Sequence, residues 1–97
     1  MKVTFKNKEV TIHICKRFDF TSHTEFSAAY KEYTVPKLTF IIDLTSTEYL
    51  DSSALGMILL IRDHATKLEG SIILKNPSIG VSNVLNIAQF DRLMTIK

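Results

Sequence analysis

Residues 38–56, LTFIIDLTSTEYLDSSALG, contain the boundary on which the fold depends. The first part, 38–44, is a β-branched and aromatic run that is typical of a strand buried in a sheet. Further along lies Asp51-Ser52-Ser53, and short polar side chains of this kind start helices by binding the free N–H groups of the first turn. A buried strand is therefore predicted to lead, through a short connection, into a helix that begins at Asp51.

The segments on either side of this boundary alternate between strand and helix patterns. The predicted strands cover 2–6, 8–15, 38–44, 71–75 and 94–96, and the predicted helices cover about 23–33, 51–68 and 79–88. Val35-Pro36 ends the first helix because proline lacks an N–H, and Gly70 is expected to close the second. About five strands that alternate with helices predict an α/β fold, with right-handed crossovers and a mixed sheet.

Length and composition limit the classes of protein to which the chain can belong. Its 97 residues fit one domain, 1–97, and 45% of them are hydrophobic, as in globular proteins. No apolar run approaches the ~18 residues of a membrane span, and the N-terminus turns polar too soon for a signal peptide. The formal net charge of +2 is far below that of proteins built to neutralise phosphates. We therefore expect a cytoplasmic protein with no membrane span and no nucleic-acid partner.

The side chains that could perform chemistry do not form a recognisable set. Ser52 or Ser53 with His64 is the one candidate pair of nucleophile and base, but residues 52 and 64 lie about 18 Å apart along the predicted helix. The three histidines lack the spacing of metal ligands, and no glycine-rich phosphate loop is present. Cys15, the single cysteine, is expected to be a buried thiol. The sequence predicts no catalytic residue, no metal and no cofactor.

The helix predicted from Asp51 to about Leu68 has two different faces. One side is expected to pack on the sheet, and its residues are Ala54, Met57, Ile58, Ile61, Ala65 and Leu68. The opposite side carries Ser52, Gly56, Leu59 and Asp63, with Leu60 beside them. Glycine costs a helix about 1 kcal/mol relative to alanine, and the leucines are more apolar than solubility requires. Close approach of a partner explains both features, although exposed leucines can also merely widen a core stripe.

Ser52 stands where this partner-facing side meets the start of the helix. A phosphoryl group on its hydroxyl would add about −1.5 to −2 charges beside N–H groups that favour anions. It would also lie next to the Asp51 carboxylate, so a partner with an apolar or acidic surface would lose affinity. We therefore predict that Ser52 is a reversible phosphorylation site. The alternative is that Asp51, Ser52 and Ser53 are only the capping residues that a helix start ordinarily has.

Several of these segments resemble the STAS family, which is named for sulfate transporters and anti-sigma factor antagonists. The matching residues are Phe40-Ile41-Ile42-Asp43-Leu44, Tyr49-Leu50-Asp51-Ser52-Ser53-Ala54-Leu55-Gly56-Met57, Leu74-Lys75-Asn76-Pro77 and Val84-Leu85. The resemblance covers nearly the whole chain and points to the free-standing bacterial antagonists. It implies a single STAS domain with helices mostly on one face of the sheet. Ala54 departs from the pattern, because many members have glycine at that position.

The resemblance also implies partners and roles. In such antagonists an anti-sigma factor with a histidine-kinase-like serine kinase fold phosphorylates the serine that follows the motif aspartate, and a metal-dependent serine phosphatase removes the phosphate. By position, that serine is Ser52, while Asp51 shapes the site and Ser53 makes a hydrogen bond at the helix start. The combination of Asp51-Ser52-Ser53-Ala54-Leu55-Gly56-Met57 with Arg17-Phe18-Asp19-Phe20 is similar to antagonists that are controlled by response-regulator phosphatases. The alternative function is a constitutively docked, unphosphorylated STAS subunit of a transporter or other assembly.

Overall fold

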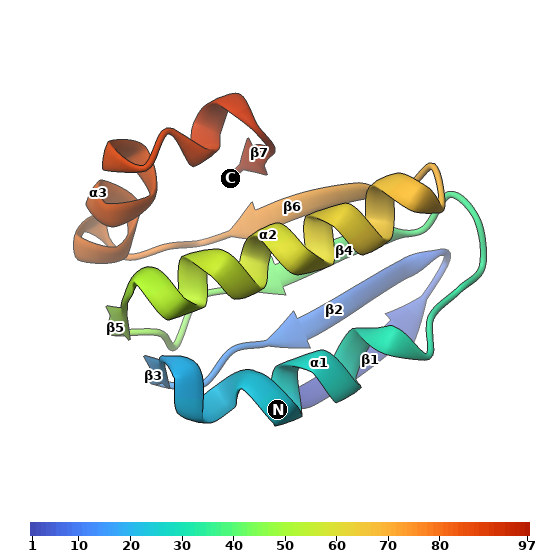
Figure 1. Ribbon diagram of the computed structural model, residues 1–97, viewed down its shortest axis with the longest axis horizontal. Helices are drawn as coiled ribbons and strands as arrows, with labels where there is room; N and C mark the ends of the chain where they lie inside the picture. The colour runs from blue at the N-terminus through green and yellow to red at the C-terminus, as the bar shows by residue number, and fades with distance from the viewer.

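A five-stranded sheet lies at the centre of the computed structural model, which describes every residue from Met1 to Lys97 (Figure 1). In spatial order its strands are β1 (Lys2–Lys6), β2 (Glu9–His13), β4 (Thr39–Asp43), β6 (Ser71–Lys75) and β7 (Thr95–Ile96). The helices are α1 (His23–Lys31), α2 (Ser52–Lys67) and α3 (Ile79–Ile87), with 3-10 turns η1 (Phe20–Ser22) and η2 (Phe90–Arg92). A separate two-stranded ribbon consists of β3 (Arg17–Phe18) and β5 (Tyr49–Leu50).

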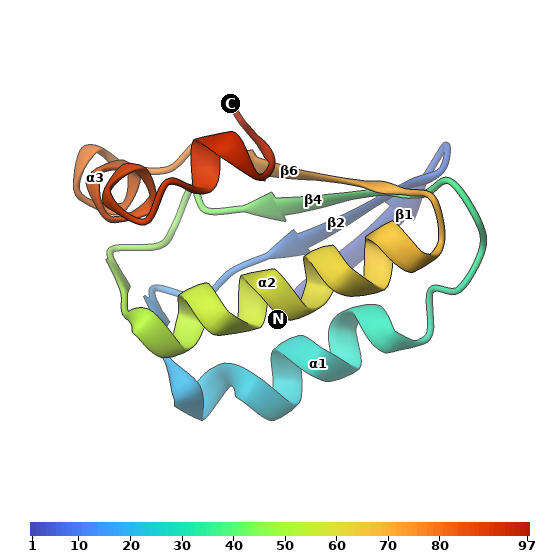
Figure 2. The ribbon, with the colours of Figure 1, turned by 45° about the horizontal axis from the view of Figure 1, so that its top comes forward.

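The helices are unevenly distributed about the sheet. α1 and α2 contact each other and lie side by side across one face, while the opposite face carries no helix (Figure 2). α3 lies beyond the end of β6, where it contacts β5 and η2. β1 and β2 are antiparallel and the other neighbouring strands are parallel. This arrangement confirms the predicted α/β fold, with a mixed sheet of about five strands and helices mostly on one face. None of the helices has the length and apolar character needed to cross a bilayer.

The alternation of apolar residues in the strands builds the core. The register places Val10, Phe40 and Ile72 in one row across β2, β4 and β6, and all three side chains are buried. Successive residues of a strand point to opposite faces of the sheet. The residues that follow these three along each strand therefore face the side without helices. There, Ile41 and Ile73 are only half-buried. The rows of side chains that face α1 and α2 are buried. A slip of one residue would move them to the opposite face, so their burial fixes the register of the sheet.

The hairpin of β1 and β2 turns around two residues, whereas the predicted strands 2–6 and 8–15 leave only residue 7 between them. Lys6 pairs with Glu9, so Asn7 and Lys8 alone form the turn. Both have positive φ, 52° and 63°, which is the geometry of the two-residue turns that match the twist of a hairpin. Asparagine tolerates this conformation better than most residues, which explains its place at the turn.

The residue that takes the left-handed conformation at the C-terminal end of α2 is not the predicted glycine. The helix ends at Lys67, and the left-handed residue that follows is Glu69, with a φ of 57°, rather than Gly70. The Gly70 N–H donates to the carbonyl oxygen of Ala65 at 2.8 Å. A Cβ at Gly70 would lie 2.3 Å from the carbonyl oxygen of Leu38, which is too close for any side chain. Glycine is therefore required by the close approach of two backbones. The Gly70 N–H closes the last turn of the helix as predicted, but the left-handed conformation belongs to Glu69.

Element boundaries and the small ribbon also differ from the sequence pattern. The second strand ends at His13 instead of residue 15, and the first helix ends at Lys31 instead of residue 33. The pattern predicts only a connection over 45–50, whereas Tyr49 and Leu50 form β5. Strands of two residues are too short to show an alternation, so this ribbon has no signal of its own in the sequence.

Asp43, at the end of β4, provides a prediction on the pH dependence of stability. Burial alone would raise the pKa of its carboxyl group, but hydrogen bonds from Thr45 and His13 outweigh burial and lower it. A lowered folded-state pKa stabilises the protein above the unfolded pKa of about 3.9, and this contribution is lost as the pH falls through the folded value. We expect Asp43→Asn to reduce the free energy of unfolding by about 1.5 kcal/mol at neutral pH and by much less near pH 3.

Urea denaturation of both proteins at pH 7 and near pH 3 measures this difference. An equal loss of stability at the two pH values would contradict the assigned role of the carboxylate charge.

Candidate phosphorylation and docking site

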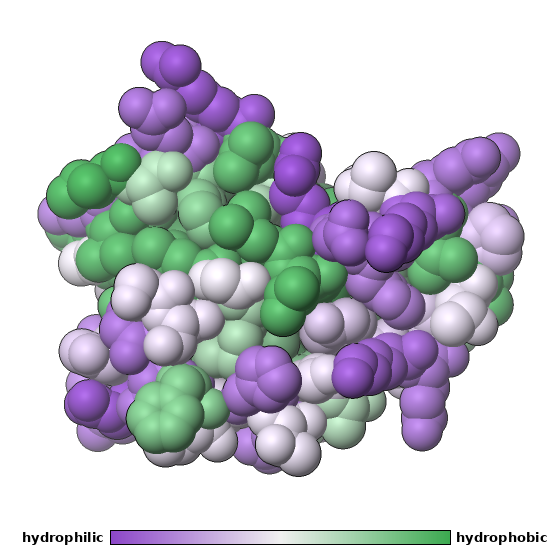
Figure 3. Space-filling model, in the orientation of Figure 1, coloured by the Kyte–Doolittle hydropathy of each residue, from purple (hydrophilic) through white to green (hydrophobic).

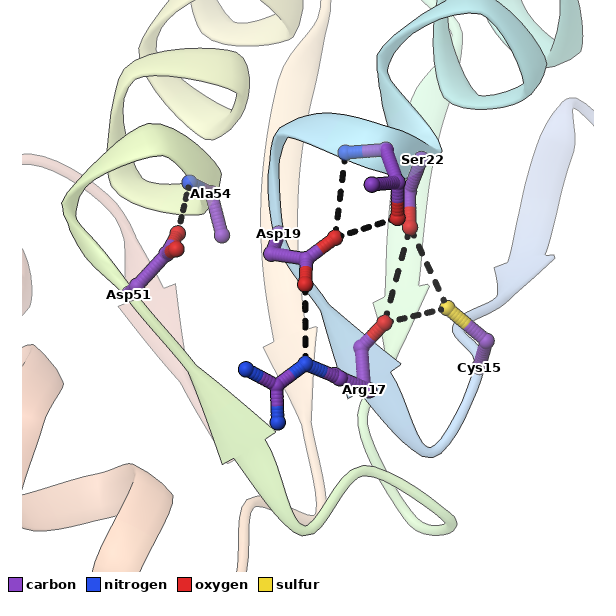
Figure 4. A network of polar contacts seen from close by, with 7 residues as sticks. Cys15, Arg17, Asp19, Ser22, Asp51 and Ala54 are labelled. Atoms are coloured by element: carbon purple, nitrogen blue, oxygen red, sulfur yellow. Dashed lines mark hydrogen bonds and ion pairs between the residues drawn. The ribbon is translucent and has the colours of Figure 1, made fainter.

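The ribbon of β3 and β5 brings two distant segments of the chain together at one end of the molecule. Its parallel register pairs Arg17 with Tyr49 and Phe18 with Leu50. An aspartate follows each strand directly, and each is the N-cap of the helical turn that begins there. Figure 4 shows these two carboxylates, Asp19 and Asp51, at the starts of neighbouring helices.

The start of α2 places the predicted phosphorylation site on the surface. Asp51 has an extended backbone, and its Oδ1 accepts a hydrogen bond from the N–H of Ala54 at 3.1 Å. Ser52 and Ser53 are the first two helical residues, and both are exposed. The side-chain hydrogen bond of the cap is thus made by Asp51, whereas the resemblance assigned such a bond to Ser53. The Ser52 hydroxyl takes no part in this capping interaction.

Asp19 is a second acidic group beside this site that sequence reasoning missed. Its Oδ1 accepts a hydrogen bond from the N–H of Thr21 at 3.0 Å, and its Oδ2 accepts one from Arg17 Nε at 2.9 Å (Figure 4). The hydroxyl of Thr21 contributes most to lowering the pKa of Asp19, and Arg17 adds to the effect. The Arg17 guanidinium also lies 4.0 Å from the centre of the Tyr49 ring. An aspartate two residues before Thr21-Ser22 was the available signal of a cap, but only the ribbon shows that it adjoins Asp51.

Cys15 lies behind this cluster and has a structural environment. Its Sγ lies 3.1 Å from the carbonyl oxygen of Arg17 and 3.5 Å from the hydroxyl of Ser22. The side chain is half-buried rather than fully buried as expected.

The side of α2 that is predicted to face a partner is exposed, and its opposite side is in the core. The exposed fractions of Leu59 and Leu60 are 40% and 54%, so a large part of each side chain is open to contact. Gly56 and Asp63 are exposed on the same side, and Asp63 forms an ion pair with Lys67 at 3.2 Å. The residues predicted to pack on the sheet are buried, except that Leu68 is half-buried: Ala54, Met57, Ile58, Ile61 and Ala65. Figure 3 shows apolar surface over this part of the molecule.

Gly56 has no structural reason to lack a side chain. A Cβ built on it would have no atom within 4 Å, and its φ is not positive. Alanine favours a helix interior over glycine by about 1 kcal/mol. We therefore expect Gly56→Ala to raise the melting temperature by roughly 4–8 °C, as measured by thermal circular dichroism. An unchanged or lower melting temperature would mean that the glycine serves the fold rather than the surface.

The three histidines belong to three different elements, β2, α1 and α2. His64 Nε2 lies 2.9 Å from the carbonyl oxygen of Tyr33, and its ring packs edge-on against Tyr30 and Phe40. That position uses His64 in packing, away from the start of α2. Among residues 1–97, no three His, Cys, Asp or Glu side chains gather closely enough to hold a metal ion.

Comparisons with known proteins define the class to which this fold and site belong. The STAS domain family matches residues 1–97, so the chain belongs to the STAS family. A STAS-domain containing protein of Pseudomonas aeruginosa (strain UCBPP-PA14) is 44% identical over 89 residues, which cover 92% of this chain and 88% of that protein.

Solved structures with the same fold include anti-sigma factor antagonists. The crystal structure of TM1081 from Thermotoga maritima, a proposed anti-sigma factor antagonist, has a TM-score of 0.82 at 20% identity and covers 98% of this chain and 83% of that chain. The antagonist SpoIIAA in its unphosphorylated form has a TM-score of 0.78 at 21% identity, with 99% and 86% covered. SpoIIAA from Bacillus in its phosphorylated form has a TM-score of 0.69 at 21% identity, with 99% and 89% covered. The chain is thus a STAS domain whose fold resembles that of anti-sigma factor antagonists.

Proposed function

We propose that this STAS domain is an anti-sigma factor antagonist that acts by phosphorylation-controlled partner switching. When Ser52 is unphosphorylated, the outer face of α2 binds an anti-sigma factor with a histidine-kinase-like serine kinase fold. That kinase phosphorylates Ser52, and a metal-dependent serine phosphatase, such as one fused to a response regulator, reverses the reaction. The observation that carries the proposal is the exposed Ser52 at the first position of α2, on the same side as Leu59 and Leu60.

The physical chemistry of a helix start supports a reversible modification at this serine. A phosphate on Ser52 would lie beside the N–H groups of the first turn, which carry partial positive charge. The fold can therefore accept the phosphate, while the new charge repels an apolar or acidic partner surface. SpoIIAA, which shares the fold, has been solved both with and without its phosphoryl group.

In this proposal the chain is a substrate and a binding partner rather than an enzyme. Asp51 shapes the site by capping the helix, Ser53 is the second motif hydroxyl, and the docking residues are Gly56, Leu59, Leu60 and Asp63. No catalytic residue, metal or cofactor of the chain itself is required. We place the reaction in the cytoplasm, because an ATP-dependent kinase and the transcription machinery act there.

Intact-mass analysis of the chain purified from its native cells tests this proposal. We expect a fraction that is heavier by one phosphate, with peptide mapping that assigns the phosphate to Ser52. The matched controls are Ser52→Ala, which should never be modified, and Ser53→Ala, which should be modified like the wild type. The cognate kinase, a histidine-kinase-like serine kinase purified from the same cells, should reproduce the modification in vitro.

A second candidate function is a constitutively docked STAS subunit of a transporter or other assembly, which would use the same exposed leucines. The absence of the heavier form under all growth conditions would favour this subunit and count against the antagonist.

A further inference from the structure

A groove lies beside the start of α2, between the ribbon and α3. It has a volume of about 260 Å³ and is lined by Glu48, Tyr49, Leu50, Gly80, Val81 and Val84. Leu50 directly precedes Asp51, so the floor of the groove continues into the cap of α2. The groove is large enough for one bulky apolar side chain.

The wall that α3 contributes to the groove is unusually apolar for a protein surface. Gly80, Val84 and Ile87 follow one another at spacings of four and three residues, so they share one side of the helix. The exposed fraction of Ile87 is 84%, and Ile79 is equally exposed. No charged residue occurs from Asn76 to Phe90. Lone exposed apolar residues are common, but an uncharged helix with two almost fully exposed isoleucines indicates a docking surface.

Gly80 lines the groove and adds no side chain to it. A Cβ on this residue would have no neighbour within 4 Å, and its φ is not positive, so neither packing nor backbone conformation requires glycine. Gly56 of α2 has the same properties: it is exposed, and no neighbour would exclude a side chain there. Two helical glycines that the fold does not need therefore lie on α2, which follows β5 in the chain, and on α3, which contacts β5.

The size of protein interfaces indicates what fills the groove. A stable complex buries about 800 Å² per partner, from roughly 20 to 30 residues on each side. The outer face of α2 offers only a few residues, so a partner bound there has to extend beyond the helix. Figure 3 shows continuous apolar surface from the middle of α2 to α3. Because the α3 wall is uncharged, the complementary surface of the partner is apolar as well.

We propose that the kinase-like partner that docks on α2 also inserts an apolar side chain into the groove of Gly80, between β5 and α3. This inference rests on the proposed function, since it assigns a second contact to the same partner. The groove contact would fix the position and orientation of the bound partner. The contact at the start of α2 would respond to the charge on Ser52. Both contacts would be needed for full affinity.

Filling the groove is the test. Gly80→Leu places a side chain where the structure has open space, so we expect an unchanged fold and a Kd for the cognate kinase that is at least about tenfold higher by calorimetry. The matched control is Asn86→Leu, which adds the same side chain to an exposed position about 120° away around the axis of α3. We expect this control to change the Kd by less than about threefold.

A second variant tests the same contact in case Gly80→Leu impairs folding. Ile87 is almost fully exposed, so Ile87→Asn cannot disturb the core, and it should also raise the Kd. Unchanged affinity in both Gly80→Leu and Ile87→Asn would overturn the groove contact and leave the proposed function intact. Failure of the wild-type chain to bind the kinase would overturn both proposals. A wild-type dimer in analytical ultracentrifugation that Gly80→Leu dissociates would assign the groove to a second copy of the chain and overturn the inference.

Discussion

Ser52→Asp is expected to weaken binding of the cognate kinase at least about tenfold, which corresponds to ~1.4 kcal/mol. The added carboxylate would stand beside Asp51 on the docking side of α2, where it costs desolvation and repels an apolar or acidic partner. A negative charge in the first turn of a helix is compatible with the helix dipole, so the fold should be retained. Calorimetry gives the affinity, and circular dichroism gives the helix content and melting temperature.

The controls for this variant separate charge from position. Ser52→Ala should keep the affinity of the wild type, because it removes the hydroxyl without adding charge. Ser53→Asp places the same charge one residue further along the exposed first turn and should weaken binding less. Equal affinities of the wild type and Ser52→Asp would mean that the switch does not operate through this residue.

Leu59→Lys should give the largest effect on the α2 contact, with a loss of about 2 kcal/mol or more, or roughly 30-fold in Kd. The side chain is 40% exposed in the free protein and would be desolvated by a partner, where an ammonium group without a counter-ion is costly. Because the residue is on the surface, the free energy of unfolding should change by about 0.5 kcal/mol or less. Binding is measured by calorimetry and stability by urea denaturation.

Val35→Lys is the matched control for Leu59→Lys. Val35 has an exposed fraction of 51% and lies in the connection between α1 and β4. This connection is close to the C-terminal end of α2, since the N–H of Lys37 donates to the carbonyl oxygen of Leu68. Val35→Lys should therefore leave the affinity unchanged. Wild-type affinity of Leu59→Lys would move the interface to another part of the molecule.

The periodic parts of the fold could be predicted from the sequence because burial imposes a period on the residues. Val10 and Ile12 alternate in β2, and the stripe from Ala54 to Ala65 follows the turn of α2, so both elements have a local signal. The ribbon depends instead on pairing between residues 17–18 and 49–50, which are remote in the sequence. The role of Gly70 depends on the backbone of Leu38 and has no local signal either.

The residues of the candidate site also fall into those with a local signal in the sequence and those without one. Asp51 and Ser52 are recognisable because capping chemistry is local and needs only a few neighbouring residues. Asp19 adjoins Asp51 only because β3 pairs with β5, and the groove exists only because α3 packs beside β5. Features formed by one segment were therefore predictable, and features formed between segments required the structure.

The capping bond of α2 runs from Asp51 to Ala54 and leaves Ser52 outside it. A phosphoryl group could therefore be added to this residue and removed again without breaking the hydrogen bond that caps the helix. In the proposed switch, the kinase and the phosphatase would then set how long each state lasts, because the modification does not require the cap of α2 to rearrange.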